Sequence, residues 1–253
     1  MPKYKIGITE AGDAGLDLSW EPKLSAVDGA ILITKCISPS FYDAVLRNKD
    51  KVIVHATFTG YGGTVLEPCV PYPYDNYDAL IHLIESGFPK EKVVIRVDPI
   101  IPTAKGIETA YNVFTSFIEN GFNRFRVSII DMYPHVRSRF VDAGLPLPYG
   151  ENRFSPLPVQ VEMVDELLAC ARLFWETNGH GCSLRLESCA EPGLTNALQC
   201  GCISAYDLQL LGLEPEDMPT GHQRRNCLCY AGKTELLSHK SRCGHRCLYC
   251  YWR

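Results

Sequence analysis

Strand-like and helix-like segments alternate along this chain, and this alternation constrains its fold more than any other feature. Six short runs rich in β-branched residues are separated by amphipathic segments whose apolar residues lie three and four positions apart. Because each strand is followed by a helix, we expect an α/β fold with a parallel sheet, an incomplete (βα)6 barrel of the TIM-like type. The predicted strands are 4–9, 30–35, 52–59, 92–98, 125–131 and 183–187, and the predicted helices are 40–47, 77–86, 104–120, 158–178 and 205–211.

Length and composition suit a barrel followed by a smaller module. With 253 residues, of which 46% are hydrophobic and 21% charged, the chain can bury a full core. We expect residues 1–187 to form the partial barrel. Most of the twelve cysteines follow residue 182, so residues 188–253 are expected to form a cysteine-rich iron–sulfur module that closes the barrel mouth. The connection 132–157 is long enough for a lid or binding loop.

The same composition bears on the compartment. No run approaches the roughly 18 apolar residues of a membrane helix, and the first residues lack the apolar stretch of a secretory signal. We therefore expect a cytoplasmic protein without membrane contact. In a reducing cytoplasm, clustered cysteines are expected to bind metal rather than form disulfides.

Polar residues share one face of several predicted strands. The interior of an ordinary barrel is packed with branched apolar side chains, so polar inward faces predict a wet cavity for a polar ligand. The alternative is that these faces belong to an open sheet and are exposed. Since functional groups of such folds gather at the carboxyl ends of the strands, the candidate residues are Thr9, Glu10, Lys35, Thr59, Arg96, Asp98, Asp131 and Glu187.

The chain ends in a closely spaced set of three cysteines, Cys243, Cys247 and Cys250. A structural zinc site and a closed iron–sulfur cube each take four protein ligands. Three thiolates therefore predict a 4Fe-4S cluster with one iron left open to a substrate or cofactor. The alternative is zinc with His239 or His245 as the fourth ligand.

This spacing, with Tyr249 just before the last cysteine, resembles the cluster loop of radical S-adenosylmethionine (SAM) enzymes. The resemblance is to a less characterised branch of that superfamily, which carries the loop at its C-terminus. It extends over most of the chain. The matching segments are 58–62, 96–101, 128–133, 188–191, 223–229 and 243–253, and the last of these is called the terminal loop below.

The resemblance implies that the open iron binds SAM and that one electron from the cluster cleaves it to methionine and a 5′-deoxyadenosyl radical, which takes hydrogen from the substrate. Polar residues near the strand ends, together with Tyr249, are expected to bind SAM. They are Thr34, Lys35, Thr57, Thr59, Arg96, Asp98, Ser128 and Glu187. Cys36, as a hydrogen-atom donor near the rim, and Glu10 and Asp131 are the candidate catalytic residues.

A second set of cysteines lies upstream and can complete a four-ligand site. It comprises Cys189, Cys200, Cys202, Cys227 and Cys229. The resemblance assigns the ligands to Cys189, Cys202, Cys227 and Cys229 and leaves Cys200 spare. The site is expected to hold a second 4Fe-4S cluster, with structural zinc as the alternative.

The expected function is reductive SAM cleavage, followed by hydrogen abstraction from a small molecule or a modified residue. An electron donor such as flavodoxin or ferredoxin is then the expected partner. The first alternative is modification or repair of a nucleobase, because residues 220–253 contain seven lysines and arginines against one glutamate. The second is a non-catalytic, zinc-stabilised binding module.

Overall fold

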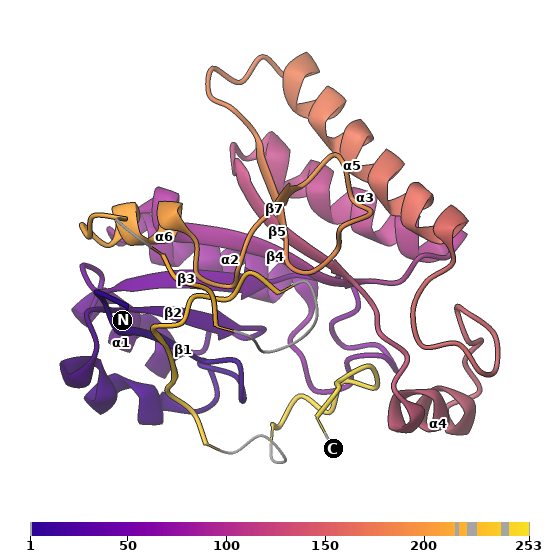
Figure 1. The fold of residues 1–253 in the computed structure, drawn as a ribbon, viewed down its shortest axis with the longest axis horizontal. Helices are drawn as coiled ribbons and strands as arrows, with labels where there is room; N and C mark the ends of the chain where they lie inside the picture. The colour runs from indigo at the N-terminus through magenta and orange to yellow at the C-terminus, as the bar shows by residue number, and fades with distance from the viewer. Residues whose placement is uncertain (1, 216–217, 222–226, 239–242, 253) are drawn as a thin grey trace. The chain divides into compact units, whose positions relative to one another are not determined.

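The computed structural model describes residues 2–215, 218–221, 227–238 and 243–252. It confirms an α/β fold with a parallel sheet (Figure 1). The strand order is β7-β6-β5-β4-β3-β2-β1-β8. The chain divides into two compact units. Unit 1 comprises Met1–Thr57, Pro71–Val94 and Cys200–Gly244, and unit 2 comprises Phe58–Val70, Ile95–Gln199 and His245–Arg253. Each unit thus combines segments from both sides of residue 187.

All six predicted strands are confirmed, and two short strands were not predicted. The confirmed strands are β1 (Ile6–Ile8), β2 (Gly29–Thr34), β3 (Val52–Thr57), β4 (Val93–Ile100), β5 (Arg124–Ile129) and β6 (Arg185–Ser188). The additional strands, β7 (Leu198–Gln199) and β8 (Lys233–Glu235), come from the cysteine-rich region. With two and three residues, they are too short for an alternating pattern to reveal them.

The predicted helices also form. They are α1 (Pro39–Arg47), α2 (Pro73–Glu85), α3 (Ala104–Glu119), α5 (Pro158–Thr177) and α6 (Ala205–Leu210), with two short 3-10 helices, η1 (Leu18–Ala26) and η2 (Lys90–Lys92). The segment 132–157, predicted as one long loop, instead contains α4 (Pro134–Asp142). None of the helices in the described part of the chain has the length and apolar character of a membrane span.

Unit 1 is built on four parallel strands. β1 pairs with β8 on one side and with β2 on the other, and β2 pairs with β3. Isoleucines at alternate positions of these strands form one buried cluster with residues of the segment around α6. The cluster contains Ile6, Ile8, Ile31, Ile53, Val94, Ile203, Leu208 and Tyr230, and Cys202 packs against it. The cysteine-rich segment is therefore part of this hydrophobic core.

Unit 2 contains most of β4, with β5, β6 and β7 paired in parallel. Helices α3 and α5 lie against each other (Figure 1), and the Phe114 ring of α3 lies 5.1 Å from the Phe125 ring of β5. Alternate positions of the same strands are charged. Arg96, Arg126 and Glu187 are register partners across β4, β5 and β6, so one polar row crosses this part of the sheet.

Candidate functional site

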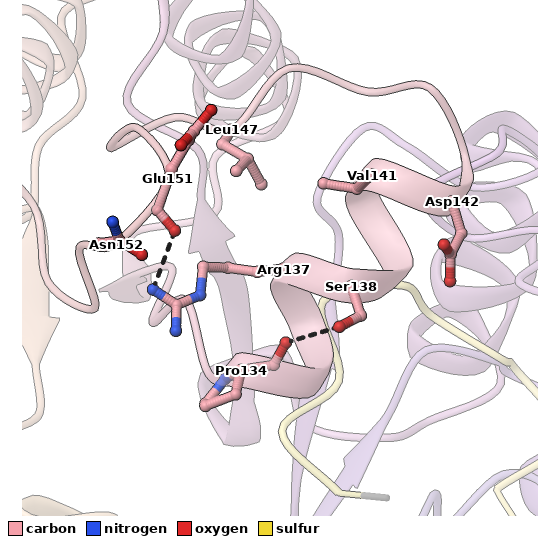
Figure 2. Close-up of a pocket in the computed structure, with 8 residues that line it drawn as sticks. All are labelled: Pro134, Arg137, Ser138, Val141, Asp142, Leu147, Glu151 and Asn152. Atoms are coloured by element: carbon pink, nitrogen blue, oxygen red, sulfur yellow. Dashed lines mark hydrogen bonds between the residues drawn. The ribbon is translucent and has the colours of Figure 1, made fainter.

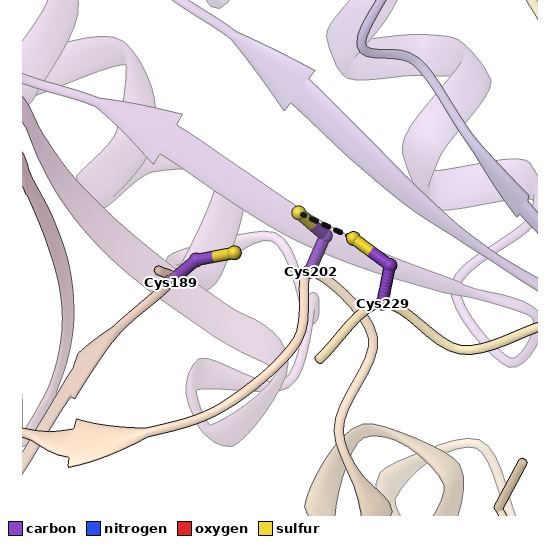
Figure 3. A group of neighbouring side chains, drawn as sticks. All are labelled: Cys189, Cys202 and Cys229. Carbon is purple, nitrogen blue, oxygen red and sulfur yellow. Dashed lines mark hydrogen bonds between the residues drawn. The ribbon is translucent and has the colours of Figure 1, made fainter. Parts of the chain in front are cut away.

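Two upstream cysteines of unit 1 converge in the structure. Cys202 precedes α6, and Cys229 precedes β8. The sulfur atoms of this convergent set are 4.0 Å apart (Figure 3). Cys229 is buried, and Cys202 is half-buried. Cys189, which follows β6 in unit 2, is also buried. Two sulfur atoms this close, in a shielded position, form the unit 1 part of a candidate metal centre.

The spacing of these sulfur atoms suits a single ion. Sulfur atoms bound at about 2.3 Å around one tetrahedral zinc lie roughly 3.8 Å apart. In a 4Fe-4S cube each thiolate binds a different iron, which places the thiolates farther from one another. The 4.0 Å between the Cys202 and Cys229 sulfur atoms therefore matches the ligand spacing of one zinc-like ion more closely than that of a cube.

Cys227 and Cys200 are placed differently from each other. Cys227 is joined to Cys229 in a disulfide, so the fourth ligand implied by the resemblance lies directly beside the group. Reduction of this bond by two electrons and two protons would release both thiols. Cys200, the cysteine left spare, is buried but does not belong to the convergent set.

A close backbone approach sets the positions of Cys202 and Cys229. A Cβ atom on Gly201 would lie 2.2 Å from the Leu228 carbonyl oxygen, so only glycine fits between the two segments. On the Cys189 side, Ala190 has a φ of 59°, the left-handed region that non-glycine residues rarely adopt. The loops that carry these cysteines are thus shaped by specific backbone constraints.

A partly buried ion pair lies beside Cys229. The Lys233 ammonium is 2.7 Å from the Glu10 carboxylate and 4.0 Å from the Cys229 sulfur. Glu235, which ends β8, accepts hydrogen bonds from the backbone N–H groups of Glu10 and Ala11, each at 3.0 Å. Burial raises the pKa of Glu235. Glu10, predicted to be catalytic, therefore holds a lysine next to the cysteine group.

The terminal loop is fastened within unit 2. The Leu248 N–H donates to the Leu66 carbonyl at 3.0 Å, and the Cys250 N–H donates to the Cys247 carbonyl at 3.1 Å. The Tyr249 hydroxyl donates to the buried Glu67 carboxylate, so Tyr249 has a structural partner where SAM contact was predicted. Cys243 belongs to unit 1.

The terminal cysteines are not in the close-set ligand group that the structure shows among its described residues. Of the two histidines considered as a fourth ligand, His245 has its Nδ1 atom 3.2 Å from the Cys69 carbonyl oxygen. His239 lies outside the described residues.

Asp13 organises the turn that carries Thr34, Lys35 and Cys36. Its carboxylate accepts from the Thr34 hydroxyl at 2.6 Å and from the Lys35 N–H at 2.6 Å. The Thr34 hydroxyl oxygen in turn accepts from the Cys36 N–H at 2.9 Å. Burial, and secondarily the charge of Asp13, raise the pKa of the Cys36 thiol. A protonated thiol is the state that a hydrogen-atom donor needs.

Three of the predicted SAM-binding residues meet in unit 2. Asp98 pairs with Arg96 and accepts a hydrogen bond from the Ser128 hydroxyl. The side chains of Arg96 and Asp98 are 15% and 23% exposed, so the pair is accessible from solvent. Thr57 and Thr59 are buried, and the Thr59 hydroxyl oxygen accepts from the Tyr61 N–H at 3.3 Å.

Glu187 is enclosed by arginines. Its fully buried carboxylate pairs with Arg124 at 3.1 Å, with Arg126 at 2.7 Å and with Arg185. Burial alone would raise the pKa of Glu187, but the charges of Arg126 and Arg124 and the hydrogen bonds of the arginines lower it to about 2. This carboxylate, predicted to bind SAM, instead neutralises part of a buried arginine cluster.

Asp131 lies near Tyr149, a residue that sequence patterns did not indicate. The Tyr149 hydroxyl donates to the Ile130 carbonyl at 2.7 Å. Burial raises the pKa of Tyr149, and the charges of Asp131 and Glu191 raise it further. Lys233 and Glu67 were also not predicted as site residues. Lys233 lies four residues after Cys229, and this spacing could have indicated that the two side chains meet.

A surface pocket in unit 2 contains none of the predicted site residues. It lies between α4 and the loop that follows it (Figure 2), and Arg137 donates there to the Glu151 carbonyl at 3.2 Å. The lining residues are Pro134, Arg137, Ser138, Val141, Asp142, Leu147, Glu151 and Asn152. No cysteine lines this pocket, so it is separate from the candidate metal centre.

Comparison with known proteins corrects the expected family. Neither curated proteins nor solved structures give a significant match. One family model, described as "Domain of unknown function (DUF1848)", matches residues 19–252. The assignment to the radical SAM superfamily was therefore wrong. Three cysteines at a short spacing describe a loop that can hold metal, and such a loop does not by itself define a family. Because the match covers nearly all of its length, the chain belongs to the DUF1848 family.

Proposed function

We propose that this protein is a metal-dependent enzyme with two cysteine-ligated centres. Once the Cys227–Cys229 disulfide is reduced, Cys189, Cys202, Cys227 and Cys229 bind one structural ion of the zinc type. Cys243, Cys247 and Cys250 bind a 4Fe-4S cluster that cleaves SAM reductively to start hydrogen abstraction from a small molecule or a modified residue. The observation that carries the proposal is the 4.0 Å approach of the Cys202 and Cys229 sulfur atoms. The proposal rests on ligand chemistry and not on superfamily membership.

The terminal loop suits an open cluster because it supplies three thiolates and no fourth cysteine. When bound, the reduced cluster supplies the electron that breaks a carbon–sulfur bond of SAM. The chain's residues hold the loop in place through the Tyr249 and Leu248 hydrogen bonds. This support keeps the cysteines on an ordered segment, as a metal loop requires.

Two further observations support the enzymatic part. Arg96, Asp98 and Ser128 form an accessible polar set in unit 2, whose guanidinium and carboxylate suit the carboxylate and ammonium groups of SAM. Cys36 is half-buried and remains protonated, so it can donate a hydrogen atom to a substrate radical. In this scheme Glu10 has a structural role, because its carboxylate holds Lys233.

The proposal extends to architecture and context. The parallel sheet curves as a partial barrel, and the cysteine-rich segment closes its mouth. Thiolate ligation requires reduced cysteines, which assigns the protein to a reducing compartment such as the cytoplasm. A flavodoxin or ferredoxin would supply the electron.

Metal analysis after anaerobic purification and reconstitution tests the proposal. We expect about four irons and about one zinc per chain, because one cube and one tetrahedral ion are present. Replacing Cys243, Cys247 and Cys250 with serine should remove the iron and keep the zinc. Replacing Cys189, Cys202 and Cys229 with serine should remove the zinc and keep the iron. Cys170→Ser, at an exposed cysteine, is the matched control.

Each alternative gives a different result. A content of about eight irons per chain would show that the upstream cysteines hold a second cube in place of the zinc ion. Zinc without iron in a folded protein, with no SAM cleavage after dithionite reduction, would refute the enzyme and leave a zinc-stabilised binding module. Salt-dependent binding of short DNA or RNA, measured by fluorescence anisotropy, would indicate that the substrate is a nucleic acid.

A further inference from the structure

Lys233 is an unusual residue to find beside a cysteine group. Its side chain is only 7% exposed, although an ammonium group loses much solvation free energy on burial. Its Nζ atom lies 2.7 Å from a Glu10 carboxylate oxygen and 4.0 Å from the Cys229 sulfur. The ammonium is therefore positioned between a carboxylate and a candidate metal ligand.

The arrangement that holds this lysine is specific. Lys233 opens β8, whose register places it opposite Ile6 of β1, and Glu10 follows β1 on the same stretch of chain. The Glu10 backbone is itself fixed, because its N–H donates to the Glu235 carboxylate at 3.0 Å. Glu235 of β8 thus positions Glu10, and Glu10 positions the Lys233 ammonium.

Charge explains what such a lysine can do. A divalent ion bound by four thiolates carries a net charge of −2, and burying that charge is costly without a nearby cation. An ammonium that donates to a thiolate sulfur offsets part of this cost, and interactions of this kind around metal ligands change affinity by about 10–100-fold. A neutral sulfur accepts a much weaker hydrogen bond than a thiolate does, so the ammonium favours the metal-bound, thiolate form.

We propose that Lys233 is a positioning residue of the upstream metal centre, which donates an N–H···S hydrogen bond to the Cys229 thiolate once the Cys227–Cys229 disulfide is reduced, and which Glu10 holds in place. This inference rests on the metal centre put forward above. It adds a specific charge requirement, because the centre must carry thiolates whose negative charge Lys233 offsets.

Cobalt(II) binding tests the inference, because cobalt replaces zinc in thiolate sites and reports on them through its absorption bands. The parent protein is the full chain with Cys243, Cys247 and Cys250 changed to serine, kept reduced with a phosphine, so that only upstream cysteines bind. The test variant is Lys233→Met combined with Glu10→Gln, which removes both charges and leaves neither buried alone. Lys233→Arg keeps the charge. Lys92→Met, at another partly buried lysine of unit 1 that donates to the Lys49 carbonyl, is the matched control.

We expect the double variant to bind cobalt about 10–100-fold more weakly than the parent and to shift the sulfur-to-cobalt charge-transfer band, while its circular dichroism stays that of a folded protein. Lys233→Arg and Lys92→Met should retain parental affinity to within a few-fold. Equal affinity and an unchanged band in the folded double variant would overturn the role of Lys233 and leave the metal centre standing. Absence of cobalt binding in the reduced parent would instead refute the centre itself, and the inference with it.

Discussion

Glu187 illustrates how single residues in this protein keep their charge inside the fold. Its carboxylate is fully buried, yet Arg124, Arg126 and Arg185 surround it. The sequence shows Glu187 and Arg185 on one strand face, but it cannot show that two arginines of a neighbouring strand share the same carboxylate. Only strand register decides that pairing.

Replacing Glu187 with glutamine should destabilise the protein by about 3–5 kcal/mol, because buried arginines lose their counter-charge. The loss should depend on pH in a defined direction. The pKa of Glu187 is lowered in the fold from its ordinary 4.5 to about 2, so its stabilising effect is complete above pH 4.5 and is lost as the pH falls toward 2. Urea unfolding of both proteins across this range measures the difference.

Glu151→Gln, at an exposed glutamate, is the control and should leave the free energy of unfolding within about 0.5 kcal/mol. A stability difference between wild type and Glu187→Gln that stays constant down to pH 2 would contradict the ion cluster.

Cys36 should react as a thiol of raised pKa. Because burial, and secondarily the charge of Asp13, raise its pKa, the rate of iodoacetamide alkylation should reach half its maximum at a higher pH in the folded protein than in the unfolded chain. Peptide mass spectrometry at a series of pH values measures this midpoint, with the same cysteine in the urea-unfolded chain as reference. A folded midpoint below the unfolded one would show an activated thiolate and remove the case for a hydrogen-atom donor.

At the scale of elements, α4 and the terminal loop belong together although about a hundred residues separate them. Arg139 of α4 donates to the Cys250 carbonyl at 2.8 Å and to the Trp252 carbonyl at 3.2 Å. Tyr133, which precedes the helix, has its ring 6.4 Å from that of Tyr251. The helix was not predicted, because Pro134 and the nearby glycines and prolines suggest a loop; proline is nevertheless well suited to the first turn of a helix.

Replacing Arg139 with alanine should loosen the terminal loop without unfolding the protein. Two hydrogen bonds from a charged donor, each contributing about 1.5–3 kcal/mol, are lost. Amide hydrogen exchange of residues 247–252 should therefore accelerate by tenfold or more, while exchange in β1 to β3 stays unchanged.

Arg137→Ala offers a matched control on the same helix, because Arg137 donates to Glu151 and not to the terminal loop (Figure 2). Faster exchange of the loop in Arg137→Ala, or none in Arg139→Ala, would argue against this anchoring.

At the scale of the whole molecule, metal binding and folding should be coupled. Cys202 and Cys229 come from separate segments of unit 1, and Cys202 packs against the core cluster of that unit. A metal that binds the folded state alone adds its binding free energy to stability.

Chelation of the upstream metal should therefore lower the midpoint of thermal unfolding by several degrees. Cys202→Ser should lower it to a similar extent and abolish the effect of the chelator. Cys200→Ser is a close control, because Cys200 is buried two positions away but lies outside the convergent set. If Cys202→Ser and Cys200→Ser change the midpoint of thermal unfolding of the metal-bound protein equally, the metal binds at another site.

The sequence by itself determined the alternation of strands and helices, because periodicity and turn residues are local properties of the chain. It therefore predicted six strands, five helices, a parallel sheet and the cysteines available as ligands. Only the tertiary structure decided which of these cysteines meet, that β7 and β8 join the sheet, and that Lys233 lies beside Cys229. These features depend on contacts between residues far apart in the chain. The loops that bring them together are set by close packing, as at Gly201, and packing of this kind leaves no periodic trace in the sequence.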